Sequence, residues 1–141
     1  SGRLAAPGMG AYSASKHAME GYSDSLRREL EQFGIAVSVV QPGPVETNFR
    51  DRVGDELGRL DRTDAYEDLY AFQEDATLIG GDGPLAVHPA AVAGDIVEAA
   101  VTPDPEPRYV VGRAAQLLVY ASYLPDRIED RIFAAIQRFS S

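Results

Sequence analysis

The feature that most constrains the fold is an uncharged, β-branched run at residues 35–41, IAVSVVQ, which directly follows a long helical pattern. Such a run is typical of a strand that is buried on both faces, as in a parallel sheet. The helical pattern covers residues 11–33, and Gly34 stands where a helix commonly ends. Pro42 and Gly43 then start a loop. A helix, a tight turn, a buried strand and a loop in this order predict an α/β fold.

Residues 44–87 differ from the rest of the chain because they carry many charges and few apolar positions. The pattern predicts one or two short helices in an excursion that ends in the loop 80–84. A connection of this length inside a compact domain is usually functional, and here it predicts a lid. Its apolar residues either line a substrate site or pack on the body of the domain. They are Tyr66, Leu69, Tyr70 and Phe72.

Residues 88–141 predict a helix, a strand and further helix. Pro89 suits the first position of an amphipathic helix, and Arg108–Val111 reads as a second short strand. Two helical pieces follow, with a break at Leu124–Pro125. Only two strands are predicted, and both have the character of central strands. Since two apolar strands do not satisfy a sheet by themselves, we expect sheet neighbours that this sequence does not contain.

Composition excludes several classes of function. The net charge of −9 disfavours a nucleic-acid surface or an anionic membrane face, because both are bound through clustered Lys and Arg. The chain has no cysteine, and His17 and His88 lack partners at ligand spacing, so no metal is predicted. No apolar run approaches the roughly 20 residues that span a bilayer. With no signal pattern at the N-terminus, we expect a cytoplasmic protein without an integral membrane segment.

Tyr12 and Lys16 are the residues that most suggest chemistry. Lys16 is the only lysine in the chain, and every other cationic side chain is arginine. Positions four apart share one helix face, so a phenol and an ammonium would face the same site. A nearby cation favours the phenolate and brings the pKa of a phenol toward the range useful for general acid–base catalysis. A surface pair without function has the same spacing, so the surrounding residues must decide.

Those surroundings resemble the short-chain dehydrogenase/reductase family. The stretch AYSASKHAMEGYSDSLRREL contains the family's Y-x-x-x-K motif as Tyr12 and Lys16, and GIAVSVVQPGPVETNF contains its P-G-x-[VI]-x-T motif. The second motif falls on Pro42, Gly43, Val45 and Thr47. The C-terminal RYVVGRAAQLLVYASYLPDRIEDRI is similar to the tail of members that act on hydroxysteroids, retinol or other lipophilic alcohols. The resemblance covers essentially the whole chain.

The resemblance implies that residues 1–141 are the C-terminal part of a single NAD(P)-binding, Rossmann-like domain. Its fold would be the C-terminal half of a doubly wound parallel sheet. Within it, residues 11–33 would be the catalytic helix, residues 44–87 an inserted substrate lid, and residues 88–141 a C-terminal helix–strand–helix unit. A loop after the carboxyl end of a central strand, as at Pro42–Gly43, is where open α/β sheets bind ligands.

The implied activity is that of an NAD(P)-dependent oxidoreductase, which moves hydride between nicotinamide and a small carbonyl compound or secondary alcohol of lipophilic character. Tyr12 would act as the general acid in reduction and as the base in oxidation. Lys16 would favour its ionised form and hold the nicotinamide ribose. The backbone around Pro42, Gly43 and Val45 would line the nicotinamide, and Thr47 would bind its carboxamide. Either NAD or NADP is expected as the cofactor.

The sequence departs from the family pattern at two places. It has no glycine-rich turn after a strand, and we interpret GGDG at residues 80–83 as a loop. The family's catalytic serine stands about thirteen positions before the tyrosine, which falls just outside this chain. Ser1 matches a later small residue of that pattern, and we do not assign it to catalysis. The chain is therefore expected to be inactive by itself.

Two other functions share these residues. The first is a non-catalytic binding or scaffold fragment with the same fold, and the second is an epimerase or dehydratase that uses the same Tyr–Lys pair. The loop PGPVET and the short lid favour the alcohol dehydrogenases.

We also expect a homo-oligomer. The helix at 11–33 carries a stripe of small residues, which suits pairing with its twin or packing on the sheet equally well. The stripe consists of Ala14, Ala18, Gly21 and Ser25. The last segment carries Leu117, Leu118, Tyr120 and Leu124, for which core packing is favoured over a pocket, subunit or membrane contact.

Overall fold

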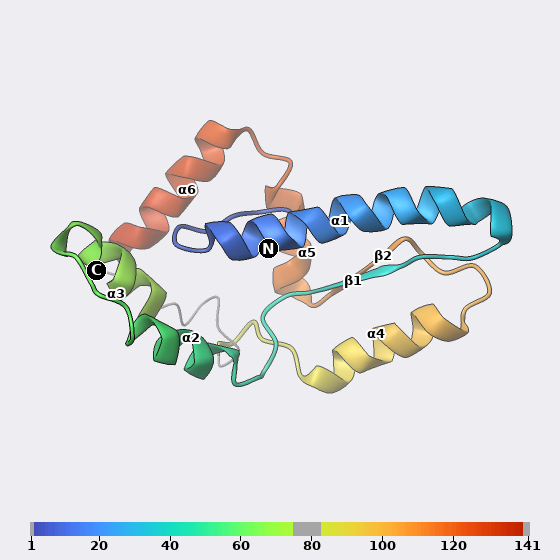
Figure 1. Cartoon of the computed structure of the whole chain (residues 1–141), viewed down its shortest axis with the longest axis horizontal. Coiled ribbons are helices and arrows are strands. Elements are labelled where there is room, and N and C mark those ends of the chain that lie inside the picture. The colour runs from blue at the N-terminus through green and yellow to red at the C-terminus, as the bar shows by residue number, and fades with distance from the viewer. Residues whose placement is uncertain (1, 75–82, 140–141) are drawn as a thin grey trace.

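The computed structural model describes residues 2–74 and 83–139, and within them a short parallel sheet lies between helices (Figure 1). Strand β1 (Val39–Pro42) pairs with β2 (Arg108–Val111), with Val39 opposite Arg108 and Pro42 opposite Val111. Helix α1 (Gly10–Leu30) lies along one side of the strands, and α4 (Pro89–Val101) along the other. The chain is thus an α/β structure with a two-stranded parallel sheet, which is consistent with part of a Rossmann-like fold.

Helix α1 occupies most of the predicted range, but its last turn is different. The α-helical hydrogen bonds end at Leu30, and a 3₁₀ turn continues over Glu31–Phe33. Gly34 then adopts a left-handed conformation with φ of 68°, and its N–H donates to the carbonyl of Glu31 at 3.0 Å. The chain reverses there and returns toward the sheet.

Strand β1 is shorter than the sequence pattern predicts. The apolar run begins at Ile35, yet the ladder begins only at Val39. The partner segment before Arg108 contains alternating prolines at 103, 105 and 107, and proline has no N–H for a ladder hydrogen bond. Burial on both faces is also not observed, because among the described residues β1 pairs with β2 alone and stays half-buried or exposed.

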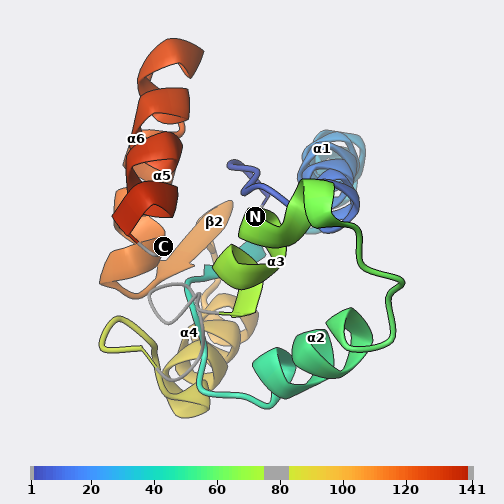
Figure 2. The same ribbon diagram turned by 90° about the vertical axis from the view of Figure 1, so that its left-hand side faces the viewer.

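The charged excursion contains two helices, α2 (Phe49–Leu57) and α3 (Glu67–Glu74), with a 3₁₀ turn at Asp64–Tyr66 before the second. Figure 2 shows α2 standing away from the strands. Residues 80–82 of the predicted loop, and so most of GGDG, lie outside the described residues.

Helix α3 is the part of the excursion that packs on the body. Phe72 keeps only 5% of its surface exposed. Next to it, the Gln73 side-chain amide donates to the carbonyl of Pro7 at 2.5 Å, in the segment that leads into α1. Tyr66, in contrast, is 58% exposed. The apolar residues of the excursion therefore divide between packing and an open surface.

The C-terminal third forms the predicted elements. His88 caps α4, since its Nδ1 accepts from the N–H of Ala90 at 3.2 Å, and Pro89 takes the first helical position. Strand β2 leads into α5 (Arg113–Ala121), and α6 (Asp126–Phe139) follows the break at Pro125. His17 lies on the exposed surface of α1, where its Nδ1 is 2.8 Å from the carbonyl oxygen of Ser13.

Two groups of residues are more exposed than their patterns suggest. The predicted core positions on the last segment are open, with Leu117 at 64% and Tyr120 at 74% of their surface exposed. Leu118 and Leu124 are exposed as well, so the favoured interpretation as core packing is wrong for the described structure. The stripe of small residues on α1 is also exposed throughout and does not pack on the sheet.

The small core sits where β2 passes into α5. Val111, Ala114 and Ala115 are buried there, and the backbone of Gly43 approaches so closely that an added Cβ would lie 3.1 Å from the N atom of Ala115. Gly112 joins the strand to the helix with φ of 92° and ψ of 152°, a region that is essentially restricted to glycine. The carboxyl end of the sheet is thereby held tightly against α5.

We expect Gly112→Ala to destabilise the protein by about 2–4 kcal/mol, from backbone strain and from overpacking. The added Cβ would lie 2.5 Å from Cγ1 of Val87. Chemical denaturation of the full-length protein measures the loss. Gly94→Ala is the matched control, because Gly94 lies inside α4 with no atom within 4 Å of the new methyl group. It should stabilise the helix by about 0.5–1 kcal/mol. Equal stability of the two variants would contradict the account.

Candidate functional site

The first turns of α1 lie at the carboxyl end of the sheet. Helix α1 runs antiparallel to β1 (Figure 1), and Glu20 in its middle contacts Gln41 of β1. Eight residues back along the helix from Glu20 to Tyr12 amount to about 12 Å. Four residues onward from Gln41 to Val45 amount to at most about 13 Å in the same direction. Tyr12 is therefore level with the loop that follows β1.

Tyr12 and Lys16 meet on one face of α1, as their spacing predicts. The Lys16 ammonium nitrogen lies 5.4 Å from the centre of the Tyr12 ring, which is the range of a cation–π contact. Tyr12 is 37% exposed, and Lys16 is half-buried. Ser13, between them in the first turn, is buried, with 3% of its surface exposed. The helix is therefore packed against the rest of the protein on that side. A phenol and an ammonium are thus held together where a ligand can reach them.

The loop after β1 is fixed by backbone hydrogen bonds on both sides. The N–H of Gly43 donates to the carbonyl of Val111 at 3.1 Å. Val87 donates its N–H to the carbonyl of Pro44 at 2.8 Å and accepts from the N–H of Glu46 at 3.1 Å. Val87, in the segment before α4, therefore forms a single parallel bridge with Val45 and fixes the position of this loop at the end of the sheet.

The predicted cofactor residues on the loop differ in exposure. Pro42 and Thr47 are exposed, whereas Gly43 and Val45 are half-buried. Among the described residues, the Thr47 hydroxyl donates one long hydrogen bond of 3.4 Å, to the carbonyl of Val45. A hydroxyl with so weak a local partner is available to a ligand.

A polar network joins α1 to both strands, and the sequence did not reveal it. The two carboxylate oxygens of Glu20 accept from the side-chain amide of Gln41 at 2.6 Å and from Nε of Arg108 at 3.1 Å. Arg108 also donates from Nη2 to Asp24 at 2.8 Å, and Arg27 donates to the same Asp24 oxygen at 3.1 Å. Glu20 follows Lys16 by one helical turn, and that spacing is the only sequence signal that points to it.

The charges of this network reinforce one another. The hydrogen bond from Arg27 is the main cause that lowers the pKa of Asp24, and Arg108 lowers it further against the opposing effect of burial. For Arg108, partial burial acts to lower the pKa, but its hydrogen bonds and ion pairs with Glu20 and Asp24 outweigh burial and raise it. Asp24 and Arg108 are thus both held in their charged forms.

The network lines a cavity of about 280 Å³ between residues 2–3, α1, the start of β2 and the end of α5. On its far side the Arg3 guanidinium donates to the hydroxyl of Tyr123 at 3.3 Å. Arg3 Nε and Gln41 Oε1 are buried and lack a hydrogen-bond partner within the part of the chain that the structure describes.

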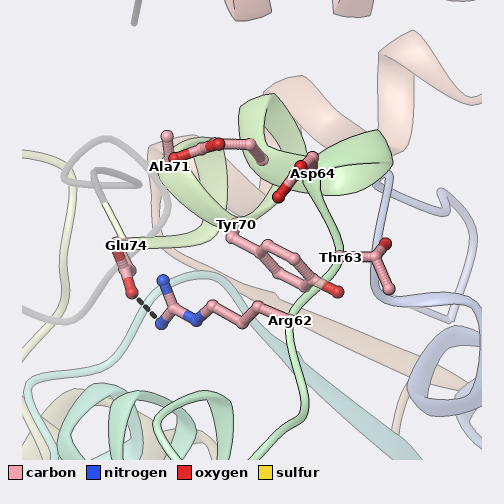
Figure 3. Close-up of a pocket in the computed structure, with 7 residues that line it drawn as sticks. Arg62, Thr63, Asp64, Tyr70, Ala71 and Glu74 are labelled. Atoms are coloured by element: carbon pink, nitrogen blue, oxygen red, sulfur yellow. Dashed lines mark hydrogen bonds and ion pairs between the residues drawn. The ribbon is translucent and has the colours of Figure 1, made fainter.

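A second cavity, of about 190 Å³, lies within the charged excursion, between the turn at Asp64–Tyr66 and α3. Figure 3 shows the Arg62 side chain running beneath the ring of Tyr70 toward Glu74. The guanidinium carbon is 5.3 Å from the ring centre, and Arg62 forms an ion pair with Glu74. These contacts join Arg62, which precedes the turn, to Tyr70 and Glu74 on α3.

Two further classes of site are not observed. Across residues 2–74 and 83–139, no three His, Asp or Glu side chains gather closely enough to hold a metal ion. None of the described helices is both long and apolar enough to cross a bilayer.

Comparison with known proteins agrees with this arrangement. Residues 1–58, which include Tyr12, Lys16 and the loop after β1, match the family model of short chain dehydrogenases. The chain is 36% identical to an NADPH-dependent 3-dehydrocapnine reductase of Ornithobacterium rhinotracheale over 94% of its own length and 46% of that protein. The chain is thus similar to members of the short-chain dehydrogenase/reductase family. It spans about half the length of the relatives it matches.

Two further members of the family match over similar shares. The chain is 34% identical to a 3-ketodihydrosphingosine reductase of Bacteroides thetaiotaomicron, over 96% of this chain and 51% of that protein. It is 32% identical to retinol dehydrogenase 7 of Rattus norvegicus, over 93% of this chain and 44% of that protein.

Proposed function

We propose that this chain carries the proton-transfer residues and substrate lid of an NAD(P)-dependent oxidoreductase that interconverts a carbonyl compound and a secondary alcohol. The observation that carries the proposal is the Tyr12–Lys16 pair at the carboxyl end of the parallel strands, level with the loop 42–47. Ligands of open α/β sheets bind at this end. The match to the short chain dehydrogenases covers this pair and this loop.

The residues present suit the nicotinamide and its ribose. The half-buried Lys16 supplies ammonium hydrogens for ribose hydroxyls, and the exposed Thr47 hydroxyl suits a carboxamide. The backbone of Gly43, pressed against α5, leaves no room for a side chain on that side of the loop. Pro42, Gly43 and Val45 would line the nicotinamide. The described residues contain no glycine-rich turn for the pyrophosphate, so the chain fits only this part of the cofactor.

When bound, nicotinamide would supply the hydride, with its two electrons, that the carbonyl carbon receives in the reduction. Tyr12 donates its phenolic proton to the carbonyl oxygen, so the product is a neutral alcohol and Tyr12 becomes a phenolate. Lys16 stabilises that phenolate through its positive charge. In the oxidation, the phenolate of Tyr12 takes the hydroxyl proton, and the hydride that leaves the carbon would pass to oxidised nicotinamide. Proton exchange with water restores Tyr12 after each turnover in either direction.

The substrate we propose is lipophilic. Tyr66 and Leu60 expose much of their surface on the lid, and Leu117 and Tyr120 do so on α5. The hydrogen bond from Gln73 to Pro7 brings α3 beside the segment that leads into Tyr12. Two of the matched relatives are named for retinol and for 3-ketodihydrosphingosine, which are both lipids.

Tyr66→Ser should lower kcat/KM for long-chain ketones about five- to thirtyfold, while leaving short ketones nearly unaffected. Loss of one apolar contact surface of a substrate weakens binding by about 1–2 kcal/mol. Initial rates against a series of ketones of increasing chain length measure the effect. Tyr22→Ser is the matched control, because Tyr22 is also exposed, at 69% against 58% for Tyr66, but lies on α1 and not on the lid. Equal losses for short and long ketones would contradict a lipophilic lid.

The proposed function is tested by following nicotinamide absorbance with the full-length protein. NADH and NADPH are each combined with a panel of ketones, and NAD and NADP with the corresponding secondary alcohols. We expect cofactor-dependent turnover in both directions with at least one of the two cofactors. Tight cofactor binding without turnover of any carbonyl or alcohol would instead favour a binding protein.

A further inference from the structure

The Glu20 carboxylate is the negative charge nearest to Lys16 along α1, yet the two do not form an ion pair. Positions four apart on a helix are neighbours, so an ammonium and a carboxylate at this spacing commonly pair. Here both oxygens of Glu20 are engaged elsewhere, by Gln41 at 2.6 Å and by Arg108 at 3.1 Å. Within the described part of the chain Lys16 has no carboxylate partner and lies over the ring of Tyr12.

The choice of partner for the Glu20 carboxylate, Arg108 or Lys16, affects proton transfer by Tyr12. If the Glu20 side chain turned toward Lys16, the carboxylate would neutralise the ammonium and draw it away from Tyr12. The stabilisation of a phenolate by Lys16 would then be reduced. The Glu20 and Arg108 side chains are only 16% and 24% exposed, so solvent screens their interaction less than that of a surface pair.

We propose that Arg108, together with Gln41, holds the carboxylate of Glu20 away from Lys16 and so leaves the ammonium available to Tyr12. Arg108 and Gln41 are thereby positioning residues that act from the two strands on a proton-transfer pair one helical turn away. This inference rests on the proposed function for its consequence in turnover, but its geometric core concerns only Lys16, Glu20 and Arg108.

The other charged and titratable groups around Glu20 do not replace Arg108. Asp24 and Arg27 on α1 pair with each other, and Asp24 shares Arg108 with Glu20. From the facing segments, Arg3 is directed to Tyr123 at the end of α5. His17 lines the same cavity and contacts the backbone of Ser13. Arg108 is thus the one cation that the described structure pairs with Glu20.

The test is a double-mutant cycle in the full-length protein, read from the pH dependence of alcohol oxidation. Oxidation needs the phenolate, so its rate rises with pH. In Arg108→Met the freed Glu20 pairs with Lys16, the phenolate loses support, and the rise should move up by about one pH unit. At pH 7 the rate then falls about tenfold. Glu20→Gln should keep the wild-type profile, and Arg108→Met/Glu20→Gln should return to it, because no charge remains to compete for Lys16.

Arg27→Met is the matched control for Arg108→Met. It removes the same charge from the same network, but Arg27 contacts Asp24 and not Glu20. Its pH profile should therefore be that of the wild type. If Arg108→Met and the double variant show the same profile, Arg108 has a purely structural role and the proposal is overturned. A shift in Arg27→Met as large as that in Arg108→Met overturns it as well.

A second readout does not depend on turnover. Lysine labelled with ¹³C at Cε gives an NMR signal for Lys16, assigned through its loss in Lys16→Arg. The chemical shift should move in Arg108→Met and return in the double variant, and an unmoved signal would overturn the proposal. If the protein shows no dehydrogenase activity, the function fails but this measurement still decides the inference.

Gln41→Leu provides the variant to use if Arg108→Met does not fold. It removes one of the two partners of Glu20, and it also removes the buried Gln41 oxygen that lacks a hydrogen-bond partner among the described residues. Removing the unpartnered oxygen offsets part of the cost of losing the hydrogen bond to Glu20. The pH profile and the Lys16 signal should shift in the same direction as for Arg108→Met, by a smaller amount. No shift in either would count against the proposal.

Discussion

Tyr12→Phe should reduce turnover by about 10²- to 10⁴-fold, the range over which a positioned acid–base group contributes. The phenol hydroxyl is the only atom lost, so the ring that Lys16 approaches at 5.4 Å remains in place. The side chain is 37% exposed, and the change removes no buried polar group. Folding and cofactor binding should therefore stay close to the wild type. Single-turnover rates and a cofactor titration by fluorescence measure the two properties separately.

The result for Tyr12→Phe also distinguishes an oxidoreductase from a non-catalytic binding protein. Loss of turnover with retained cofactor binding assigns Tyr12 to proton transfer. A variant with near-normal activity would remove Tyr12 from the mechanism and with it the main support for the proposed function. Tyr22→Phe is the matched control, because Tyr22 lies on the same helix, is more exposed, and has no place in the proposed chemistry. It should leave both turnover and binding unchanged.

Local signals explain most of what the sequence predicted about the fold. The helix at 11–33, the helix that begins at Pro89 and the break before Pro125 depend on residues within a few positions of each other. Their main-chain hydrogen bonds and caps form within the same segment, as the contact between His88 and Ala90 illustrates. The spacing of Tyr12 and Lys16 is local in the same sense, and the structure brings both to one helix face.

Properties that depend on distant residues were predicted less well. The start of β1 is set by prolines at 103, 105 and 107, far along the chain from the apolar run that predicted a longer strand. The ion pair between Glu20 and Arg108 joins residues 88 positions apart, and no pattern in either segment predicts it. Its partner residues could be found only after the strands were placed beside α1.

Burial was the least predictable property. Of the apolar residues in the charged excursion, Phe72 is buried and Tyr66 is exposed, although both occur in the same short apolar pattern. Leu117 and Tyr120 on α5 are exposed where core packing was favoured. An apolar side chain in the sequence favours burial, but whether another element covers it depends on the tertiary arrangement. Strand β1 is likewise less buried than its apolar sequence predicts, because among the described residues it pairs with one strand, β2.

Lys16→Arg should lower turnover about 10- to 100-fold and weaken cofactor binding at the same time. The charge is retained, so a smaller loss than for Tyr12→Phe is expected. The guanidinium is broad and planar, whereas the ammonium is compact and directs three rotatable hydrogens, so the two do not substitute well at a site with fixed geometry. Lys16 is half-buried and lies over the ring of Tyr12, so the wider group would change the geometry of this contact. Turnover and a cofactor titration on the full-length protein measure both effects.

The comparison with other substitutions shows what the single lysine contributes. Lys16→Met removes the charge as well and should be impaired more than Lys16→Arg, with a larger loss in turnover than in binding. Arg28→Lys is the control for an Arg–Lys exchange on an exposed part of the same helix, and it should behave as the wild type. If Lys16→Arg also behaves as the wild type, any cation suffices at this position. The use of lysine in a chain whose other cations are all arginine would then have no catalytic reason.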